Sequence, residues 1–299
     1  MTGTLREDNG CAAPAAALKA LLEGGSIEVM PRTAAKIEDF RPLLRPGTRV
    51  YIAHIEGTPI DDMVATARRL TDEGFEPMPH LPARIIPDRR LLEVWARRYR
   101  EEAGVTQALL LGGGLSQPLG DLDSSIAMLE TGIFDRLGYH RLHIAGHPEG
   151  NKDIDIEGGT LRVDEALQWK QAFSERTDAE MAIVTQFAFD AAPVITWAER
   201  LKEAGIKLPI HIGVAGPTKL QTLIKFAISC GVGASLSVLQ KRALDLRKLL
   251  VPYEPSDFLC DIAAYIATRP DTLIEQAHIF PLGGIQASTE WLSRMQTSA

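Results

Sequence analysis

The sequence predicts a closed α/β barrel of the (β/α)8 TIM type, and three observations support this. Eight short β-rich segments alternate with longer segments of helical periodicity along the chain. No Gly-x-Gly-x-x-Gly motif follows the first β-rich segment, which disfavours an open dinucleotide-binding sheet. No linker-like composition divides the 299 residues. We therefore expect one barrel domain over residues 1–299, with residues 1–25 as an N-terminal extension or helix.

The predicted strands follow one another between residues 26 and 284. They are 26–31, 49–55, 76–81, 108–114, 141–150, 182–190, 209–217 and 277–284. The helical patterns between them include 61–74, 88–104 and 192–205, and each of these ends in a glycine of the kind that caps a helix. Residues 241–271 predict extra helices before the eighth strand.

The composition is that of a soluble globular protein, with 45% hydrophobic and 24% charged residues. The net charge of -7 is spread along the chain, and the arginine clusters at 89–90 and 97–100 fit exposed helix faces, so we expect no nucleic-acid partner. The absence of a signal peptide or a long apolar run predicts a cytoplasmic protein without membrane contact. Three scattered cysteines predict reduced thiols. Helical faces on the barrel exterior lead us to expect a homo-oligomer.

Polar residues stand at the ends of the predicted strands, where the active site of such a barrel forms. Glu28 alternates with apolar neighbours, and a buried carboxylate is costly without partners, so we interpret it as a functional group with a raised pKa. His80 fits a structural or a functional role equally. The glycines at 112–114 let a ligand approach the backbone, although a flexible turn explains them as well. The amide of Gln186 suits a heterocycle, or backbone and water partners.

The end of the fifth strand places an imidazole, a carboxylate and an amide together, in His147, Glu149 and Asn151. A simple turn would need only a Gly or an Asn, so this segment predicts a bound polar ligand. His54, His80 and His147 could gather round a metal, but no HxH or HExxH spacing supports that arrangement. We therefore predict no metal site.

Five segments resemble, in order, the methylenetetrahydrofolate reductase family, in its flavin-dependent, bacterial-type catalytic barrel. They are SIEVMP, PHL, AGHPEGN, VTQFAFD and LKEAGIKLPIHIGV, and the resemblance runs from about Ser26 to Leu282. It implies an eight-stranded barrel that binds FAD at its mouth, with a tetrahydrofolate derivative stacked on the flavin. The implied reaction interconverts 5,10-methylenetetrahydrofolate and 5-methyltetrahydrofolate by hydride transfer at flavin N5.

The resemblance also implies roles for individual residues. Glu28 matches the family's general acid, which protonates folate N10 in one direction and removes that proton in the other. The residues assigned to the cofactor side are His54, His80, Gly112, Gly113, Gly114, Ser124, Ser125, His147, Glu149, Gly150, Asn151 and Lys170. The residues assigned to the substrate side are Gln186, Gln221, Phe226 and Phe280, and the match at Gln221 requires one inserted residue.

Two departures from the family pattern bear on the direction of the reaction. The family's Arg-Gly-Asp reads Gly-Gly-Gly here, so Gly114 replaces an aspartate near the flavin, and Gly284 replaces an arginine associated with the folate. Loss of an anion near a flavin makes its reduced form easier to reach, because repulsion by one charge is worth on the order of 1 kcal/mol. We predict a bias towards oxidation of 5-methyltetrahydrofolate, with NAD(P)H or another electron donor or acceptor as redox partner.

Two alternatives stay open on the residues alone. A barrel lyase or hydrolase that uses Glu28 with a histidine would bind no flavin. A catalytically impaired flavin- or folate-binding protein would bind its ligand without turnover.

Overall fold

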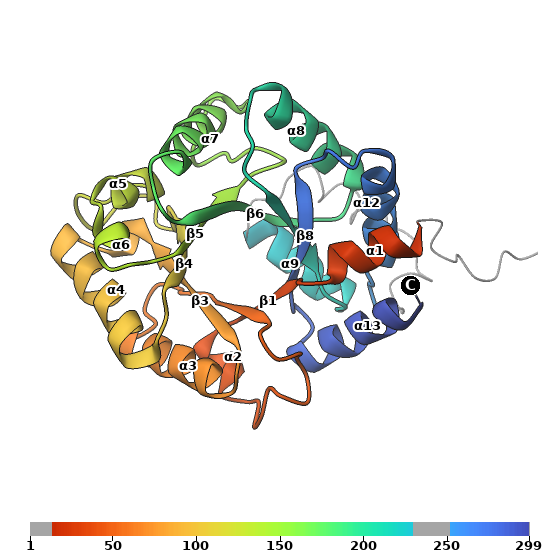
Figure 1. Cartoon of the computed structure of the whole chain (residues 1–299), viewed down its shortest axis with the longest axis horizontal. Coiled ribbons are helices and arrows are strands. Elements are labelled where there is room, and N and C mark those ends of the chain that lie inside the picture. The colour runs from red at the N-terminus through yellow and green to blue at the C-terminus, as the bar shows by residue number, and fades with distance from the viewer. Residues whose placement is uncertain (1–13, 230–251, 299) are drawn as a thin grey trace, which may run out of the picture.

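Eight strands form a closed barrel, which lies at the centre of the molecule with helices around it (Figure 1). This computed structural model describes residues 14–229 and 252–298. The strands are parallel and follow chain order around the ring, and the eighth pairs with the first, so the barrel is closed. The prediction of a (β/α)8 barrel is confirmed.

All eight predicted strands are present, and several are shorter at their carboxyl ends than predicted, because the polar residues that follow them lie in loops. The strands are β1 Ser26–Val29, β2 Arg49–Ile52, β3 Glu76–Pro82, β4 Gln107–Leu111, β5 Arg141–Gly146, β6 Glu180–Ala188, β7 Ile210–Ala215 and β8 Ile274–Phe280. The helices are α1 Ala15–Leu22, α2 Pro31–Ala34, α3 Ile60–Asp72, α4 Arg89–Ala103, α5 Ser125–Glu130, α6 Ile133–Arg136, α7 Leu161–Ser174, α8 Ala191–Glu203, α9 Leu220–Ser229, α12 Ser256–Thr268 and α13 Ile285–Ser298, with a 3-10 turn at Ala83–Ile85.

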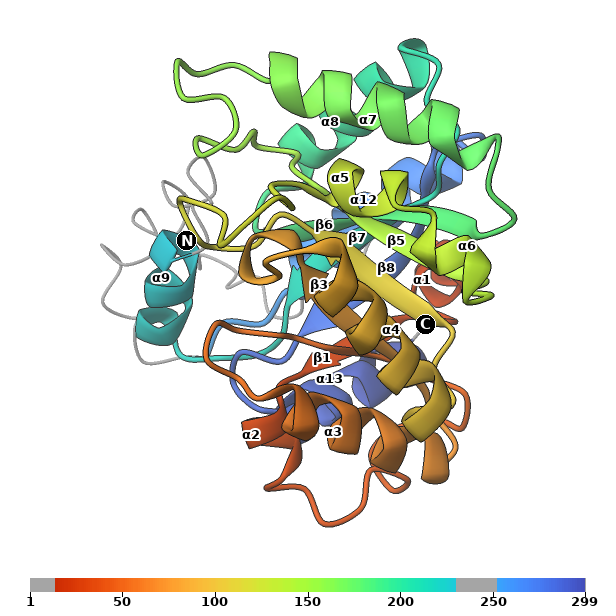
Figure 2. The same ribbon diagram turned by 90° about the vertical axis from the view of Figure 1, so that its left-hand side faces the viewer.

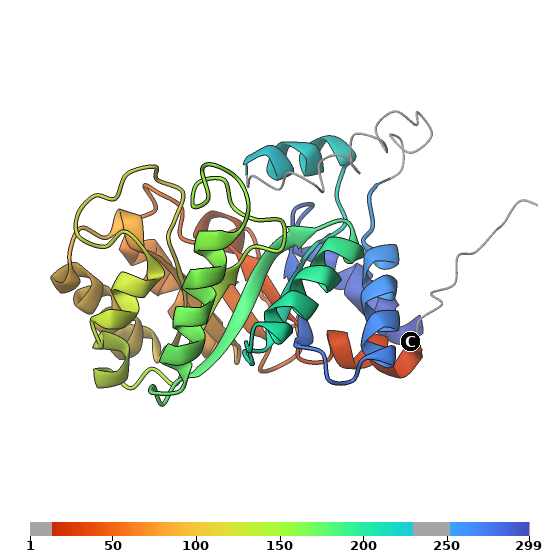
Figure 3. The same ribbon diagram turned by 90° about the horizontal axis from the view of Figure 1, so that it is seen from above.

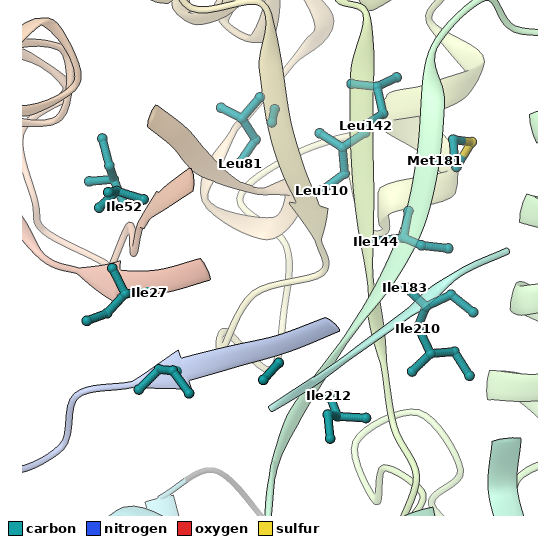
Figure 4. Packing of buried hydrophobic residues seen from close by; sticks show 14 of the residues in the cluster. Ile27, Ile52, Leu81, Leu110, Leu142, Ile144, Met181, Ile183, Ile210 and Ile212 are labelled. Atoms are coloured by element: carbon teal, nitrogen blue, oxygen red, sulfur yellow. The ribbon is translucent and has the colours of Figure 1, made fainter. Parts of the chain in front are cut away.

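The main hydrophobic core lies between the barrel and the helices. Its strand residues include Ile27, Ile52, Leu81, Leu110, Leu142, Ile144, Met181, Ile183, Ile210 and Ile212, all buried (Figure 4). Because side chains alternate along a strand, their sequence neighbours point into the barrel. Those inward residues are unusually polar, and they include Tyr51, His143, His211 and His278, all of them buried.

The predicted helices begin and end where their capping residues require. In α4, the Asp88 side chain accepts a hydrogen bond from the Leu91 backbone N–H at 2.7 Å. The glycines that end the three predicted helical patterns, Gly74, Gly104 and Gly205, have φ of 91°, 67° and 85°, a conformation that favours glycine. These capping predictions are confirmed.

The amino-terminal segment and the segment before β8 each contain a helix in their described parts. α1 packs against β8, α12 and α13, as the predicted N-terminal helix, and α12 supplies one of the predicted extra helices. Residues 1–13 and the 241–251 part of that prediction lie outside the described residues. Cys260 on α12 is disulfide-bonded, so the expectation of three reduced thiols is wrong. Among the helices of residues 14–229 and 252–298, we find none that could span a lipid bilayer.

The carboxyl ends of the strands define the mouth of the barrel. α9 and the long loops after β4 and β5 lie at this end, on the left of Figure 2 and at the top of Figure 3. α1 lies towards the opposite end (Figure 3). Any site built from the predicted strand-end residues therefore faces α9 and these two loops.

Candidate functional site

Glu28 on β1 lies between two imidazoles. Its Oε2 is 3.3 Å from His80 Nε2 on β3 and 3.8 Å from His278 Nε2 on β8. The Oγ of Ser26 is 2.9 Å from His278 Nδ1 and holds that ring from the other side. The structure thus brings the predicted residues Glu28 and His80 together and adds Ser26 and His278, which the sequence reasoning missed.

Period-two spacing could have identified both missed residues. Ser26 lies two residues before Glu28 on β1, so the two side chains share the inward face. His278 lies two residues before Phe280 on β8, and the two rings touch edge to face with centroids 4.7 Å apart. The inward face of β8 therefore presents both residues to the mouth, and it places the predicted substrate residue Phe280 next to His278.

The carboxyl group of Glu28 is ionised at neutral pH. Burial alone raises the pKa of Glu28, but its interactions with the His80 and His278 imidazoles outweigh burial and lower the pKa to about 2. The prediction of a raised pKa is wrong, because only the folded barrel brings two imidazoles to this carboxylate. Burial lowers the pKa of His278, although Glu28 opposes that change, so His278 is neutral at pH 7.

The imidazole nitrogens that face Glu28 lack well-formed hydrogen bonds in the described part of the chain. The Nε2 atoms of His80 and His278 are buried, and neither has a hydrogen bond of good geometry within the described chain. Buried polar atoms without partners are rare in proteins. The unsatisfied pair indicates a site that is completed by a bound polar group.

A buried cation on α7 lies beside the loop after β5. The side chain of Lys170 on α7 is only 7% exposed, and it forms no hydrogen bond or ion pair within residues 14–229 and 252–298. Burial lowers the pKa of Lys170 to about 8, and burial together with the Lys170 charge lowers the pKa of His147 to about 4. A buried charge without a counter-charge is unfavourable, so this place favours an anionic ligand.

The remaining predicted residues of this loop shape its turn. Gly150 has a φ of 78°, which favours glycine, and the Oδ1 of Asn151 accepts a hydrogen bond from the Asp153 N–H at 2.9 Å. Glu149 is half-buried beside them. The segment from His147 to Asn151 is therefore an ordered turn that brings its polar groups close to one another.

The three glycines after β4 differ from one another. Gly113 has a φ of 93°, and a Cβ there would lie 2.9 Å from Pro82 Cβ, so the turn itself requires glycine. The carbonyl of Gly112 accepts a hydrogen bond from the Arg84 N–H at 2.9 Å. A Cβ on Gly114 would meet no atom within 4 Å. Space for a side chain or a ligand therefore exists at Gly114, where the resembling family carries an aspartate.

The structure places several predicted cofactor residues in supporting positions. His54 Nε2 is 3.0 Å from the Thr58 carbonyl, and its ring stacks on Trp95 of α4 at 5.1 Å between centroids. Ser124 caps α5 by accepting a hydrogen bond from the Ala127 N–H at 3.3 Å. Ser125 is buried in the first turn of that helix. None of these contacts joins the residues to Glu28.

β6 carries an irregularity beside Gln186. Val184 of β6 pairs with His211 of β7, and the next pair is Phe187 with Gly213. Three residue steps on β6 therefore match two on β7, and this extra residue is a β-bulge. The Oγ1 of Thr185 accepts a hydrogen bond from the Gly213 N–H at 2.8 Å and compensates for the interrupted ladder. The bulge turns the ring of Phe187 towards Phe280, with centroids 5.5 Å apart.

The two remaining substrate-side predictions lie on α9. Gln221 is exposed, and the side chain of Phe226 is 37% exposed. α9 stands off the carboxyl end of the barrel (Figure 2). Both side chains are therefore available to a ligand, and no contact within the described chain ties them to Glu28.

A cavity of about 1130 Å³ lies at the opposite end of the barrel, away from the mouth. It is lined by residues at the amino ends of β1, β2 and β8 and by α13, among them Ser26, Arg49, Gln276 and Arg294. Its other walls come from the loop before β2 and from outward-facing residues of β1 and β8, such as Ile27 and Ile279. Among the described residues, no three His, Cys, Asp or Glu side chains are arranged to hold a metal ion.

Fold and site together define a (β/α)8 barrel with an ionised carboxylate and two imidazoles at its mouth. No family model matches the sequence. The chain is similar to an uncharacterized protein from Clostridium thermocellum that binds two copies of 5-methyl-5,6,7,8-tetrahydrofolic acid, with a TM-score of 0.57, 12% identity, and coverage of 95% of this chain and 98% of that one. A dihydropteroate synthase from Yersinia pestis matches over 92% of each chain at 12% identity, with a TM-score of 0.43. At this identity, the first likeness shows the fold.

Proposed function

We propose that the protein is an FAD-dependent oxidoreductase that interconverts 5-methyltetrahydrofolate and 5,10-methylenetetrahydrofolate and favours oxidation of the methyl form. The observation that carries this proposal is the Glu28 carboxylate at the mouth, within 3.3 Å of His80 and 3.8 Å of His278. The ring closure in that direction needs a base for the N10 proton, and an ionised carboxylate serves as one.

The charge state of Glu28 supports the oxidative direction. A general acid for ring opening must carry a proton before the reaction, which a carboxyl with a pKa of about 2 does not do at pH 7. A base must be unprotonated, which this carboxyl is. The open space at Gly114, where no anion stands, favours the same direction, because a negative charge there would oppose reduction of a neighbouring flavin.

The residues of the β5–α7 segment fit FAD. Lys170 is a buried cation without an anionic partner in the described chain, and the FAD pyrophosphate would supply the missing charge. The ordered turn at His147–Asn151 lies beside it and would orient the ribose. FAD, when bound, supplies the acceptor for the hydride. The chain's own residues bind the cofactor, orient the folate and handle the N10 proton.

The binding of 5-methyltetrahydrofolate by the Clostridium thermocellum protein supports a folate substrate here. That protein binds two copies, which makes a folate-binding protein without turnover the second candidate. The two candidates differ in stoichiometry. A flavoenzyme takes one FAD and one folate, whereas a carrier of that kind takes two folates.

The visible spectrum of the purified protein, before and after incubation with FAD, is the direct test. We expect a flavin spectrum that 5-methyltetrahydrofolate bleaches under anaerobic conditions. A parallel addition of NADH shows whether NAD(P)H also reduces the flavin. A protein that binds no FAD would support the lyase or hydrolase alternative if it turned over, or the two-folate carrier if calorimetry found two folates per chain. A flavin that no folate bleaches would indicate an impaired binding protein.

A further inference from the structure

Buried polar side chains continue from Glu28 down the interior of the barrel. Tyr51, His143, His211 and His278 form a contiguous layer, and none is more than 3% exposed. Barrels usually fill these positions with Val, Ile and Leu. Polar groups are costly to bury, so a connected set of four in the barrel interior points to a function beyond packing.

These buried polar side chains form a line through the barrel interior, and the upper part of the line starts at the candidate site. Glu28 Oε2 lies 3.8 Å from His278 Nε2, and His278 Nδ1 lies 2.9 Å from Ser26 Oγ. The ring of Tyr51 packs against His278 with centroids 4.4 Å apart. Burial raises the pKa of Tyr51, and an interaction with the Ser26 side chain is among those that oppose the rise. Ser26 therefore lies next to both His278 and Tyr51.

The lower part of the line reaches solvent. Tyr51 Oη is 2.5 Å from His143 Nδ1, and the rings of His143 and His211 touch edge to face with centroids 4.9 Å apart. His211 Nε2 lies 3.6 Å from Glu275 Oε2, and the side chain of Glu275 is 53% exposed. His211 Nδ1 has no hydrogen-bond partner in the described chain. No hydrogen bond at this nitrogen therefore prevents the His211 ring from rotating towards His143.

We propose that these side chains form a proton relay that carries the proton taken up by Glu28 through the barrel to solvent at Glu275. The relay rests on the proposed function, because it returns Glu28 to the ionised state that the next folate requires. It assigns roles in proton transfer to Tyr51, His143 and His211, which have no place in the site at the mouth.

The transfer in the upper part conserves protons. Protonated Glu28 gives its proton to Nε2 of His278, whose Nδ1–H passes to the Ser26 oxygen. The Ser26 hydroxyl proton passes to the oxygen of Tyr51. The phenolic proton of Tyr51 is released at the same time, so each group gains one proton and loses one.

The lower part conserves protons in the same way. The Tyr51 proton goes to Nδ1 of His143, and the Nε2–H of His143 passes to Nδ1 of His211 after rotation of one ring or through a water molecule. The Nε2–H of His211 goes to the Glu275 carboxylate and from there to solvent. One proton enters at Glu28 and one leaves at Glu275.

Neutral imidazoles suit this role, because each has one nitrogen that donates and one that accepts. Burial lowers the pKa of His143, and the nearby His211, Arg49, Arg141 and His278 side chains lower it further. No imidazolium needs to accumulate during a concerted transfer. The arginines near the amino end of the barrel are therefore compatible with proton passage.

The charges around the other two histidines have the same consequence. Burial lowers the pKa of His211. Glu275 opposes this lowering, whereas Arg49 and Arg141 lower the pKa further. For His278, burial and the charges of His80 and His211 lower the pKa against the effect of Glu28. Both rings are therefore neutral before the transfer.

Tyr51→Phe tests the relay with the least disturbance, since it removes one hydroxyl and keeps the buried ring. Tyr139→Phe is the matched control, because Tyr139 is also buried and donates its hydroxyl to the Ala96 carbonyl at 2.9 Å, away from the line. With a pH dye and FAD-loaded protein, we expect Tyr51→Phe to slow proton release after mixing with 5-methyltetrahydrofolate by about tenfold or more. Glu275→Gln should act in the same direction, and Tyr139→Phe should leave the rate unchanged.

A second measurement needs no flavin. In 15N-histidine NMR spectra, we expect Glu28→Gln to shift the imidazole signals of His143 and His211, because the relay couples their tautomers to the carboxylate. Tyr51→Phe should abolish that shift, whereas Tyr139→Phe should not. If the wild-type protein shows no folate-dependent bleaching, the proposed function fails and this measurement alone decides whether the relay exists.

Two results would overturn the relay. One is a Tyr51→Phe protein that matches Tyr139→Phe in both measurements. The other is slow proton release in Ser26→Ala with a normal rate in Tyr51→Phe. That second result would mean that the proton leaves directly from Ser26 into the amino-terminal cavity, which Ser26 lines.

Discussion

Glu28 on β1 and His80 on β3 meet inside the barrel across the strand that separates them, with 3.3 Å between Oε2 and Nε2. Tyr51, on the intervening strand β2, is the register partner of Glu28. In a (β/α)8 barrel, inward-pointing residues of alternate strands share one layer of the interior, and closure also brings β8 with His278 next to β1. The charge of Glu28 therefore depends on closure of the barrel.

Replacement of Glu28 by Gln should leave FAD binding unchanged and slow the reaction with 5-methyltetrahydrofolate by about 10²-fold or more, since the amide cannot take the N10 proton. Stopped-flow bleaching of the flavin measures this rate. Glu290→Gln, at an exposed carboxyl on α13, is the control. Equal rates in wild type and Glu28→Gln would remove the assigned role.

Replacement of Lys170 by Met should weaken FAD binding, because the methionine keeps the apolar stem and removes the charge. Since the pKa of Lys170 is about 8 in the unliganded protein, affinity of the wild type should also fall as pH rises above 8. Quenching of flavin fluorescence at pH 7 and pH 9 measures both effects. Lys152→Met, at an exposed lysine of the same segment, should bind FAD like wild type. If Lys170→Met does so too, the phosphate-side assignment is wrong.

Introduction of an aspartate at Gly114 should lower the flavin potential and slow oxidation of 5-methyltetrahydrofolate. The position has room, because a Cβ meets nothing within 4 Å. One charge worth on the order of 1 kcal/mol corresponds to roughly 20 mV for a two-electron couple. Gly114→Asn, of the same size without the charge, is the control for an anaerobic redox titration. Identical potentials in the two variants would disprove the electrostatic argument.

Stability should fall as pH drops below about 6.5. The pKa values of His143, His211 and His278 are lowered by burial, so the unfolded chain binds more protons than the folded chain below that pH. Each histidine then costs up to about 1.4 kcal/mol of unfolding free energy per pH unit. The lowered pKa of Glu28 adds a loss of the same sign below pH 4.5. Urea unfolding between pH 7.5 and pH 4 measures the slope.

The matched variants for this slope replace two histidines of opposite burial, His143 within β5 and His140 immediately before it. His143→Phe should flatten the dependence on pH, because it removes a buried titrating group. His140→Gln should leave it unchanged, since His140 is exposed and its Nδ1 lies 2.8 Å from Thr106 Oγ1. A flat profile in the wild type would mean that the barrel interior accepts charged imidazoles.

Local patterns were sufficient for the architecture. Alternation of short apolar segments with helical periodicity predicted all eight strands, and the glycines at positions such as 104 predicted where helices end, because both signals depend on residues a few positions apart. The same reasoning placed Glu28 and His80 at the mouth, since parallel strands end at one side of a barrel.

The sequence by itself determined the barrel, the order of its strands and the end at which its polar residues gather. Tertiary structure alone decided that Glu28 is ionised, that His278 and Ser26 stand beside it, and that His54 stacks on Trp95. The reason is that periodicity is a property of neighbouring residues in the chain. A pKa and a hydrogen bond depend on groups that only folding brings together, such as His278, which lies 250 positions from Glu28 in the chain.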